Sequence, residues 1–236
     1  MTRRKYLMMI VGLMLFVVSS ALLQSCSDDD DEYYYDVNVP NAIVSIASNG
    51  NGHPILVLND STQLYPVNLR SELYGGKRMR AFVSLRQPKD SELSDGIYAD
   101  GLKNVYVNWI DTIRTKEMAP DQGLKNDSVY GNDPLEIVDD WTTYVEDGFL
   151  TIRFRTLFGN GKTHILNLVK GPADNEVVVH QNANGDVRGT MADGVIAFSL
   201  KKLGLQPGTT HQLTVKWNSF SGMKSHTFTY RVPKRD

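Results

Sequence analysis

A regular alternation of apolar and polar side chains constrains this chain more than any other feature of its sequence. Leu150, Ile152 and Phe154 are separated from one another by single threonine and arginine residues. Successive side chains of a β-strand point to opposite faces of its sheet, so this pattern predicts a strand with one face in a core and the other in water. The turn residues Gly159–Lys162 follow, and a second apolar run comes directly after them. The pattern therefore predicts an antiparallel sheet.

The second half of the chain, residues 134–236, repeats this pattern. Roughly six short apolar runs are separated by turn signals such as Asp193-Gly194, a spacing typical of an antiparallel β-sandwich. Trp217 alternates with Leu213 and Val215. We therefore expect Trp217 to lie in the core of this domain.

The first half, residues 37–117, predicts a smaller β-domain. Met79, Ala81, Val83 and Leu85 share one face of a clear strand, and about five short strands suit a small closed or partly open barrel. Residues 118–133 are polar, contain proline and glycine and show no apolar period, so we expect a linker there. The fold class predicted is all-β, with a small barrel followed by an antiparallel β-sandwich.

Residues 1–25 have the pattern of a lipoprotein signal. Arg3, Arg4 and Lys5 precede the apolar run Leu7–Val18, and the segment ends in Leu23-Gln24-Ser25-Cys26. An apolar residue three positions before a cysteine and a small residue directly before it are what the acylating and cleaving enzymes require. A plain signal peptide or an uncleaved anchor is the alternative, although the run is short for a span of about 20 residues. We expect a lipid on Cys26 that anchors the chain to a membrane.

Residues 26–36 predict an acidic, tyrosine-rich tether. Ser27 is followed by four consecutive aspartates, Asp28, Asp29, Asp30 and Asp31. Such a block of like charge stays solvated and extended, and it also resembles the tag that certain anaerobes use to export lipoproteins to the cell surface. We expect an outer-membrane lipoprotein that faces outward, with the periplasmic face as the alternative. The next residues, Tyr33, Tyr34 and Tyr35, either form a stacking platform or pack against the domain edge.

The sequence does not point to a catalytic, cofactor or metal site. With its one cysteine lipidated, the mature chain has no thiol for a disulfide, a zinc site or a nucleophile. Its histidines are scattered, and the loop Asn182–Asp186 has calcium-ligand residue types but is more simply a hairpin turn. The formal net charge of -2 is unfavourable for a nucleic-acid partner.

Two pairs of adjacent acids lie near Trp141. Asp139-Asp140 precede it and Glu146-Asp147 follow it. A glycosidase needs two carboxylates on opposite sides of the bond it cleaves, but adjacent acids in a strand point to opposite faces, and Asp147-Gly148 is a turn signal. We therefore expect a turn there and no enzymatic activity.

Together, several segments resemble the NigD-like family of secreted lipoproteins. They are Tyr33–Tyr35 with Pro40-Asn41-Ala42, Gly76–Ala81, Trp109–Lys116, Glu146–Leu150, Lys162–His164 with Asn167–Val169, and Phe198–Leu200. The resemblance covers essentially the whole mature chain, with Val37–Val39 as a small departure before Pro40. It implies an OB-type barrel followed by a β-sandwich and no assigned catalytic residue. The family takes its name from a gene beside a bacteriocin locus, which implies an immunity-like role.

The function that we predict is therefore a non-enzymatic binding module with a protein or glycan partner at the cell envelope. Phe220, in a turn-rich loop, and Trp141, near the domain junction, are the candidate contact residues, together with the three tyrosines Tyr33–Tyr35. Aromatic side chains of this kind form recognition surfaces when they are exposed. The alternative is a carbohydrate-binding surface lipoprotein that uses the tyrosines as a flat face. The oligomeric state is not predicted.

We expect the substitution Cys26→Ala to abolish membrane attachment while the domains still fold. The tether carries no predicted core residue, so removing the thiol removes only the site of acylation. Fractionation of cells followed by circular dichroism of the released protein measures both properties. A variant that is unfolded, or one that stays in the membrane fraction, would contradict the assignment of Cys26.

Overall fold

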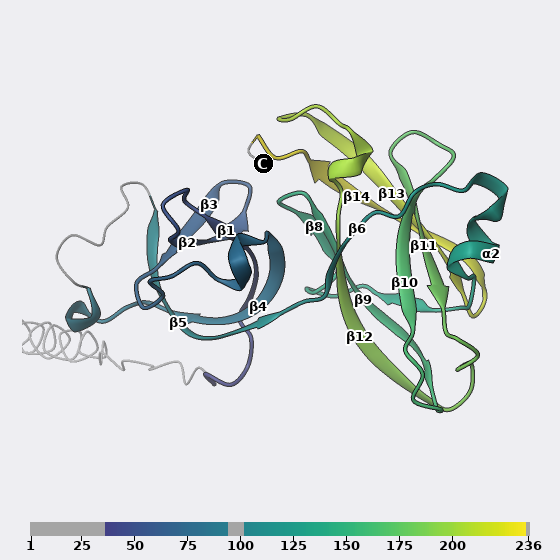
Figure 1. The fold of residues 1–236 in the computed structure, drawn as a ribbon, viewed down its shortest axis with the longest axis horizontal. Helices are drawn as coiled ribbons and strands as arrows, with labels where there is room; N and C mark the ends of the chain where they lie inside the picture. Colours follow the sequence, from purple (N-terminus) through teal and green to yellow (C-terminus); the bar gives the residue numbers. More distant parts are fainter. Residues whose placement is uncertain (1–35, 94–101, 235–236) are drawn as a thin grey trace, which may run out of the picture. The chain divides into compact units, whose positions relative to one another are not determined.

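The structure of the protein, a computed structural model, describes residues 36–93 and 102–234 (Figure 1). All the elements below belong to one compact unit, Val37–Asp236. The signal, the lipidation site Cys26, the export residues Ser27–Asp31 and the tyrosines Tyr33–Tyr35 lie outside the described residues. Within the described ranges, no helix has the length and apolar content needed to cross a membrane.

The first domain is a closed five-stranded barrel. Its strands are β1 (Ala42–Ser48), β2 (Pro54–Asn59), β3 (Thr62–Pro66), β4 (Met79–Arg86) and β5 (Lys103–Thr112). They are arranged in the order β1-β2-β3-β5-β4, and β4 closes the barrel by pairing with β1. Ala81 and Val83 are fully buried inside it, and Met79 and Leu85 pack against the same core. The prediction of an OB-like barrel is confirmed, including the inward face of β4.

The second domain is a sandwich of two sheets. One contains β10 (Ile165–Lys170), β11 (Glu176–Asn182), β13 (Thr210–Ser219) and β14 (Gly222–Arg231), in that order. The other contains β6 (Thr115–Glu117), β12 (Thr190–Ser199), β9 (Phe149–Phe158) and β7 (Glu136–Val138), with β8 (Tyr144–Glu146) also paired to β9. Most pairs are antiparallel, but β11 runs parallel to β13, because the strand between them, β12, belongs to the opposite sheet. The predicted β-sandwich is confirmed.

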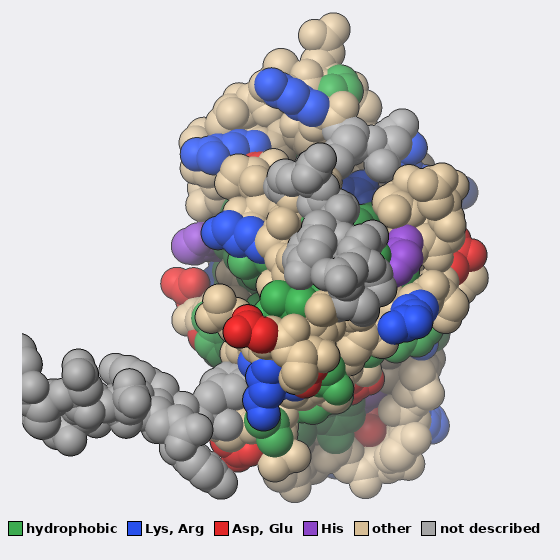
Figure 2. All heavy atoms as spheres, turned by 90° about the vertical axis from the view of Figure 1, so that its left-hand side faces the viewer, with side chains coloured by type: hydrophobic (Ala, Val, Ile, Leu, Met, Phe, Trp, Pro, Cys, Tyr) green, Lys and Arg blue, Asp and Glu red, His purple; other side chains and the backbone are tan. Residues whose placement is uncertain are grey.

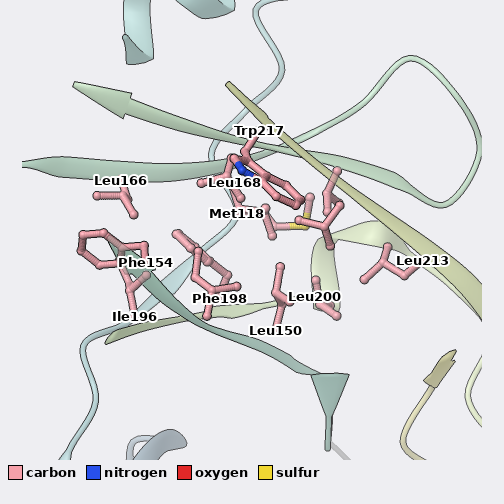
Figure 3. Packing of buried hydrophobic residues seen from close by; sticks show 14 of the residues in the cluster. Met118, Leu150, Phe154, Leu166, Leu168, Ile196, Phe198, Leu200, Leu213 and Trp217 are labelled. Atoms are coloured by element: carbon pink, nitrogen blue, oxygen red, sulfur yellow. The ribbon is translucent and has the colours of Figure 1, made fainter. Parts of the chain in front are cut away.

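The core of the sandwich lies between the two sheets (Figure 3). Leu150, Ile152 and Phe154 of β9 face it, whereas Arg153 and Arg155 lie on the outer face, as the alternation predicted. Trp217 of β13 is only 6% exposed and packs in the same core. In Figure 3 the side chains of β9 and β12 lie opposite those of β10 and β13, and Met118 fills the space between them.

The passage between the domains differs from the predicted linker. Only Ile113 and Arg114 separate β5 of the barrel from β6, which pairs in parallel with β12 of the sandwich. Residues 118–133 instead run along the sandwich: Met118 is buried in its core, and the short helix α2 (Asn126–Tyr130) lies near β10 and β11. This segment lacks an apolar period because most of it outside the short helix is irregular backbone, whose N–H groups at Ala119 and Asp133 donate to carbonyls of neighbouring strands.

We expect Phe198→Ala to destabilise the protein by about 3–5 kcal/mol, because it leaves a cavity at a fully buried side chain. The matched control is Phe220→Ala, which removes the same atoms from a side chain that is 42% exposed and should cost less than about 1 kcal/mol. Chemical denaturation of both variants gives the two values. Equal losses at the two positions would contradict the assigned core.

Candidate functional site

The two domains meet through a small apolar cluster on the outside of the barrel. Ile43 of β1, Ile113 of the passage and Ala197 of β12 are almost fully buried there. Phe82 of β4 and Tyr144 of β8 pack against the same cluster. Part of the outer face of β12 is therefore covered by the barrel at this end of the sandwich.

A single arginine, Arg80 of β4, is buried within this junction with no exposed surface. Its Nη1 donates to Ser45 Oγ at 2.9 Å, and its Nη2 bonds the Tyr144 hydroxyl, whose ring lies 5.1 Å from the guanidinium carbon. Burial lowers the pKa of Arg80, and Tyr144 and nearby carboxylates act in the opposite direction. The guanidinium thus joins a barrel strand, β1, to a sandwich strand, β8.

The turn between β8 and β9 supplies a second contact with the barrel. Asp147 and Gly148 both have positive φ, 49° and 80°, as a two-residue turn of type I′ requires. The turn predicted at Asp147-Gly148 is therefore present. The Asp147 carboxylate is 1% exposed and lies 2.6 Å from Arg78 Nη2, and the Arg78 guanidinium carbon lies 5.4 Å from the centre of the Phe149 ring.

Glu146, directly before the turn, forms the third contact. Its Oε1 accepts the backbone N–H of Asp60, in the turn between β2 and β3, at 2.7 Å. Burial and the neighbouring Asp60 carboxyl raise the pKa of Glu146 to about 7. Glu146 and Asp147 of the sandwich therefore both contact the barrel, through the Asp60 N–H and the Arg78 guanidinium.

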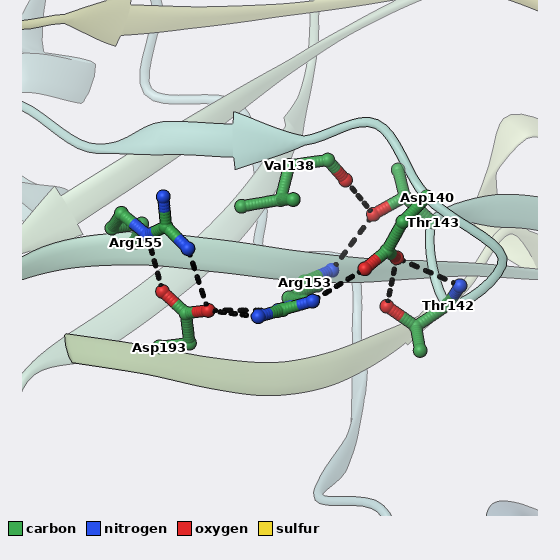
Figure 4. Close-up of polar contacts among 7 residues, drawn as sticks. All are labelled: Val138, Asp140, Thr142, Thr143, Arg153, Arg155 and Asp193. Atoms are coloured by element: carbon green, nitrogen blue, oxygen red, sulfur yellow. Dashed lines mark hydrogen bonds and ion pairs between the residues drawn. The ribbon is translucent and has the colours of Figure 1, made fainter.

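The other pair of acids singled out in the sequence is Asp139-Asp140, and Asp140 bonds within the sandwich, where it fixes the loop that carries Trp141. Asp140 Oδ1 accepts the N–H and the hydroxyl of Thr142, and Asp140 Oδ2 lies 2.5 Å from Arg153 Nη1 (Figure 4). Arg153 also pairs with Asp193, which Arg155 binds from the same strand (Figure 4). These bonds from Arg155 and Arg153 lower the pKa of Asp193 to about 2.

The structure places the two described contact residues at different ends of the sandwich. Trp141 is 57% exposed and lies edge-on to Phe82 of the barrel, with ring centres 6.1 Å apart. Phe220 lies at the tip of the β13–β14 hairpin, at the end of β14 opposite Arg231. Sequence reasoning missed Met223, which is 62% exposed beside that tip.

Within the described ranges, no group of three or more His, Cys, Asp or Glu side chains is arranged to hold a metal ion. Asn184 and Gly185 form the tight turn of the loop Asn182–Asp186, and Asp186 accepts the backbone N–H groups of Gly159 and Asn160. On the face seen in Figure 2, lysine and arginine side chains are interspersed with acidic ones. Opposite charges on that face therefore offset one another over short distances.

Comparison with known proteins identifies the second domain. Residues 117–230 match the family model described as the NigD-like C-terminal beta sandwich domain, so the resemblance to the NigD-like family is confirmed on this half of the chain. The comparison with curated proteins gives no match.

Solved structures share the fold over most of the chain. A protein from Parabacteroides distasonis, described as toxin related, is 29% identical, with a TM-score of 0.66 over 82% of this chain and 93% of its own. A protein of unknown function from Bacteroides vulgatus is 21% identical, with a TM-score of 0.60 over 80% and 89%. A NigD-like immunity protein from Bacteroides caccae is 17% identical, with a TM-score of 0.56 over 84% and 98%.

We expect the stability of the protein to decrease as the pH rises from about 4.5 through 7. Glu146 in the folded protein keeps its proton up to a pKa of about 7, above the ordinary 4.5, so the folded state binds more protons in this interval. Thermal unfolding at pH 5 and pH 8 measures the change. Glu146→Gln should make the midpoint depend less on pH, and Glu136→Gln, on a distant strand, is the control. Parallel pH profiles for wild type and Glu146→Gln would contradict the assignment.

Proposed function

We propose that this NigD-like chain is a lipid-anchored envelope protein whose sandwich domain binds another protein, in an immunity-like role without catalysis. Three observations support the proposal: the NigD-like family match, the shared fold with a protein named as a NigD-like immunity protein, and the lipoprotein signal that ends at Cys26. The acidic run after Ser27 supports the outer membrane, facing outward, as its location.

The observation that carries the binding role is the apolar tip of the β13–β14 hairpin. Phe220 is 42% exposed and Met223 is 62% exposed, and the two side chains flank the same turn. Exposed aromatic and methionine side chains are enriched in the central contacts of protein interfaces. Ser219 stabilises the turn, because its Oγ donates to the carbonyl of Gly222 at 2.7 Å. The tip is therefore held in shape before a partner arrives.

The strand behind the tip adds a second means of recognition. β14 is the last strand in its sheet among those described, and Gly222–Thr227 are exposed along it. An edge strand offers backbone N–H and C=O groups to an extended segment of a partner, while side-chain contacts supply specificity. Phe220 and Met223 would supply those contacts here.

The junction acids support a structural role. Asp147 pairs with Arg78, Glu146 accepts an N–H group of Asp60, and Asp140 pairs with Arg153. Each of these carboxylates is engaged in holding a turn or the two domains. These contacts make the framework behind the contact surface rigid, and a binding surface needs such a rigid support.

We expect a photo-crosslinking amino acid at position 220 to form an adduct with one discrete protein in intact cells. The matched control is the same amino acid at position 124, where Leu124 is fully exposed on the surface of the sandwich domain. Gel shift and mass spectrometry of the adducts measure the difference between the two positions.

A second variant tests whether the tip itself is recognised. Crosslinking from position 221 should fall at least about tenfold when Phe220 and Met223 are both changed to serine, as expected for loss of a hot spot. Equal adducts at positions 220 and 124, or an adduct from 221 that is unaffected by the serine variant, would refute the proposed surface.

A further inference from the structure

A cavity of about 320 Å³ opens where the barrel, the β8–β9 turn and the C-terminal segment meet. The barrel contributes Arg78, and the sandwich contributes the rest of the wall from four separate segments. The lining includes Arg78, Phe149, Leu200, Lys201, Leu205 and Tyr230. A hollow of this size between domains is typical of sites for small ligands or single side chains.

The floor of the cavity is apolar and is fixed by backbone hydrogen bonds. Phe149 and Leu200 are 4% and 1% exposed, and the N–H of Leu200 donates to the carbonyl of Gly148 at 2.8 Å. In the C-terminal part of the lining, the N–H of Val232 donates to the carbonyl of Thr209 at 2.9 Å. Because both parts of the lining are bonded in place, an apolar group can enter without reorganising them.

The polar groups of the cavity favour an acceptor that carries negative charge. Arg78 uses Nη2 for Asp147, which leaves further N–H groups of its guanidinium for another acceptor. The Asp147 carboxylate is only 1% exposed and is not among the lining residues, so Arg78 is the charged donor that faces both Asp147 and the cavity. An anionic acceptor in the cavity can therefore share the guanidinium of Arg78 with Asp147.

Tyr230 adds a neutral donor. Its side chain is buried, at 3% exposure, and lines the cavity. Within the described part of the chain, no hydrogen bond joins its hydroxyl to another residue. Burial raises the pKa of Tyr230 to about 12, so the hydroxyl keeps its proton and can donate to a ligand.

We propose that this cavity binds an apolar carboxylate, either a small free acid or the C-terminal residue of a peptide. The apolar part lies on Phe149, Leu200 and Leu205, and the carboxylate accepts hydrogen bonds from Arg78 and the Tyr230 hydroxyl. Charged hydrogen bonds of this kind are stronger than neutral ones. The site is distinct from the β13–β14 tip and does not depend on the function proposed for it.

Calorimetric titration of the full chain tests the proposal with matched pairs of probes. The free acids are 4-phenylbutyrate and the tripeptide Gly-Gly-Leu, and their controls are the corresponding amides. We expect at least one acid to bind about tenfold more tightly than its amide. Tighter binding of the tripeptide would identify a peptide C-terminus, and tighter binding of phenylbutyrate would identify a free acid. Equal affinity of each acid and its amide would overturn the proposal. So would the absence of any binding heat with probe concentrations up to about 10 mM, since a Kd of that size corresponds to a binding free energy of only about 3 kcal/mol.

Variants locate the binding in this cavity. Leu205→Trp fills the apolar part and should abolish binding, and Tyr230→Phe removes only the hydroxyl and should weaken binding severalfold. Lys201→Gln should also weaken binding, and Lys125→Gln, on the helix side of the sandwich, should leave it unchanged. If Leu205→Trp does not fold, the two milder variants decide. Unchanged affinity in both Tyr230→Phe and Lys201→Gln would place the binding elsewhere and refute the site.

Discussion

A guanidinium group withdrawn from water determines how the two domains meet. Arg80 has no exposed surface, and a buried charge is costly unless hydrogen bonds and nearby dipoles replace its lost hydration. Ser45 on the barrel and Tyr144 on the sandwich supply those bonds. Because the two partners belong to different domains, the guanidinium keeps both hydrogen bonds only while the domains stay in contact in this arrangement. Any other contact that buried Arg80 without these partners would cost the hydration of its charge.

The remaining contacts reinforce the same arrangement from one turn. Asp147 pairs with Arg78, which precedes Arg80 by two residues, and Glu146 accepts the N–H of Asp60. The chain crosses between the domains through only Ile113 and Arg114, so little freedom remains in the connection. The proposed carboxylate cavity depends on this rigidity because Arg78 and the sandwich wall come from different domains. The hairpin tip at Phe220 lies at the other end of β14 and depends only on the sandwich.

The sequence predicted well those features whose cause is local. The alternation along β9, the turn at Asp147-Gly148 and the burial of Trp217 all follow from residues within a few positions of one another. The linker was misplaced because a polar, proline-containing segment without periodicity has the same pattern whether it connects two domains or lies along one of them. The role of Arg80 was missed because the strand pattern puts it on the outer face of β4, which meets water in an isolated barrel.

Strand periodicity and turn chemistry act between near neighbours, so the class of fold and the residues that face each core follow from the amino-acid sequence. Which outer faces are covered and which charges meet depends on how the two folded domains pack together. Arg80 and Tyr144 are 64 residues apart, and Asp60 and Glu146 are 86 residues apart. Pairings over such distances arise only when two folded domains are brought together, and no local pattern encodes them. The junction and its cavity are for this reason products of the domain contact.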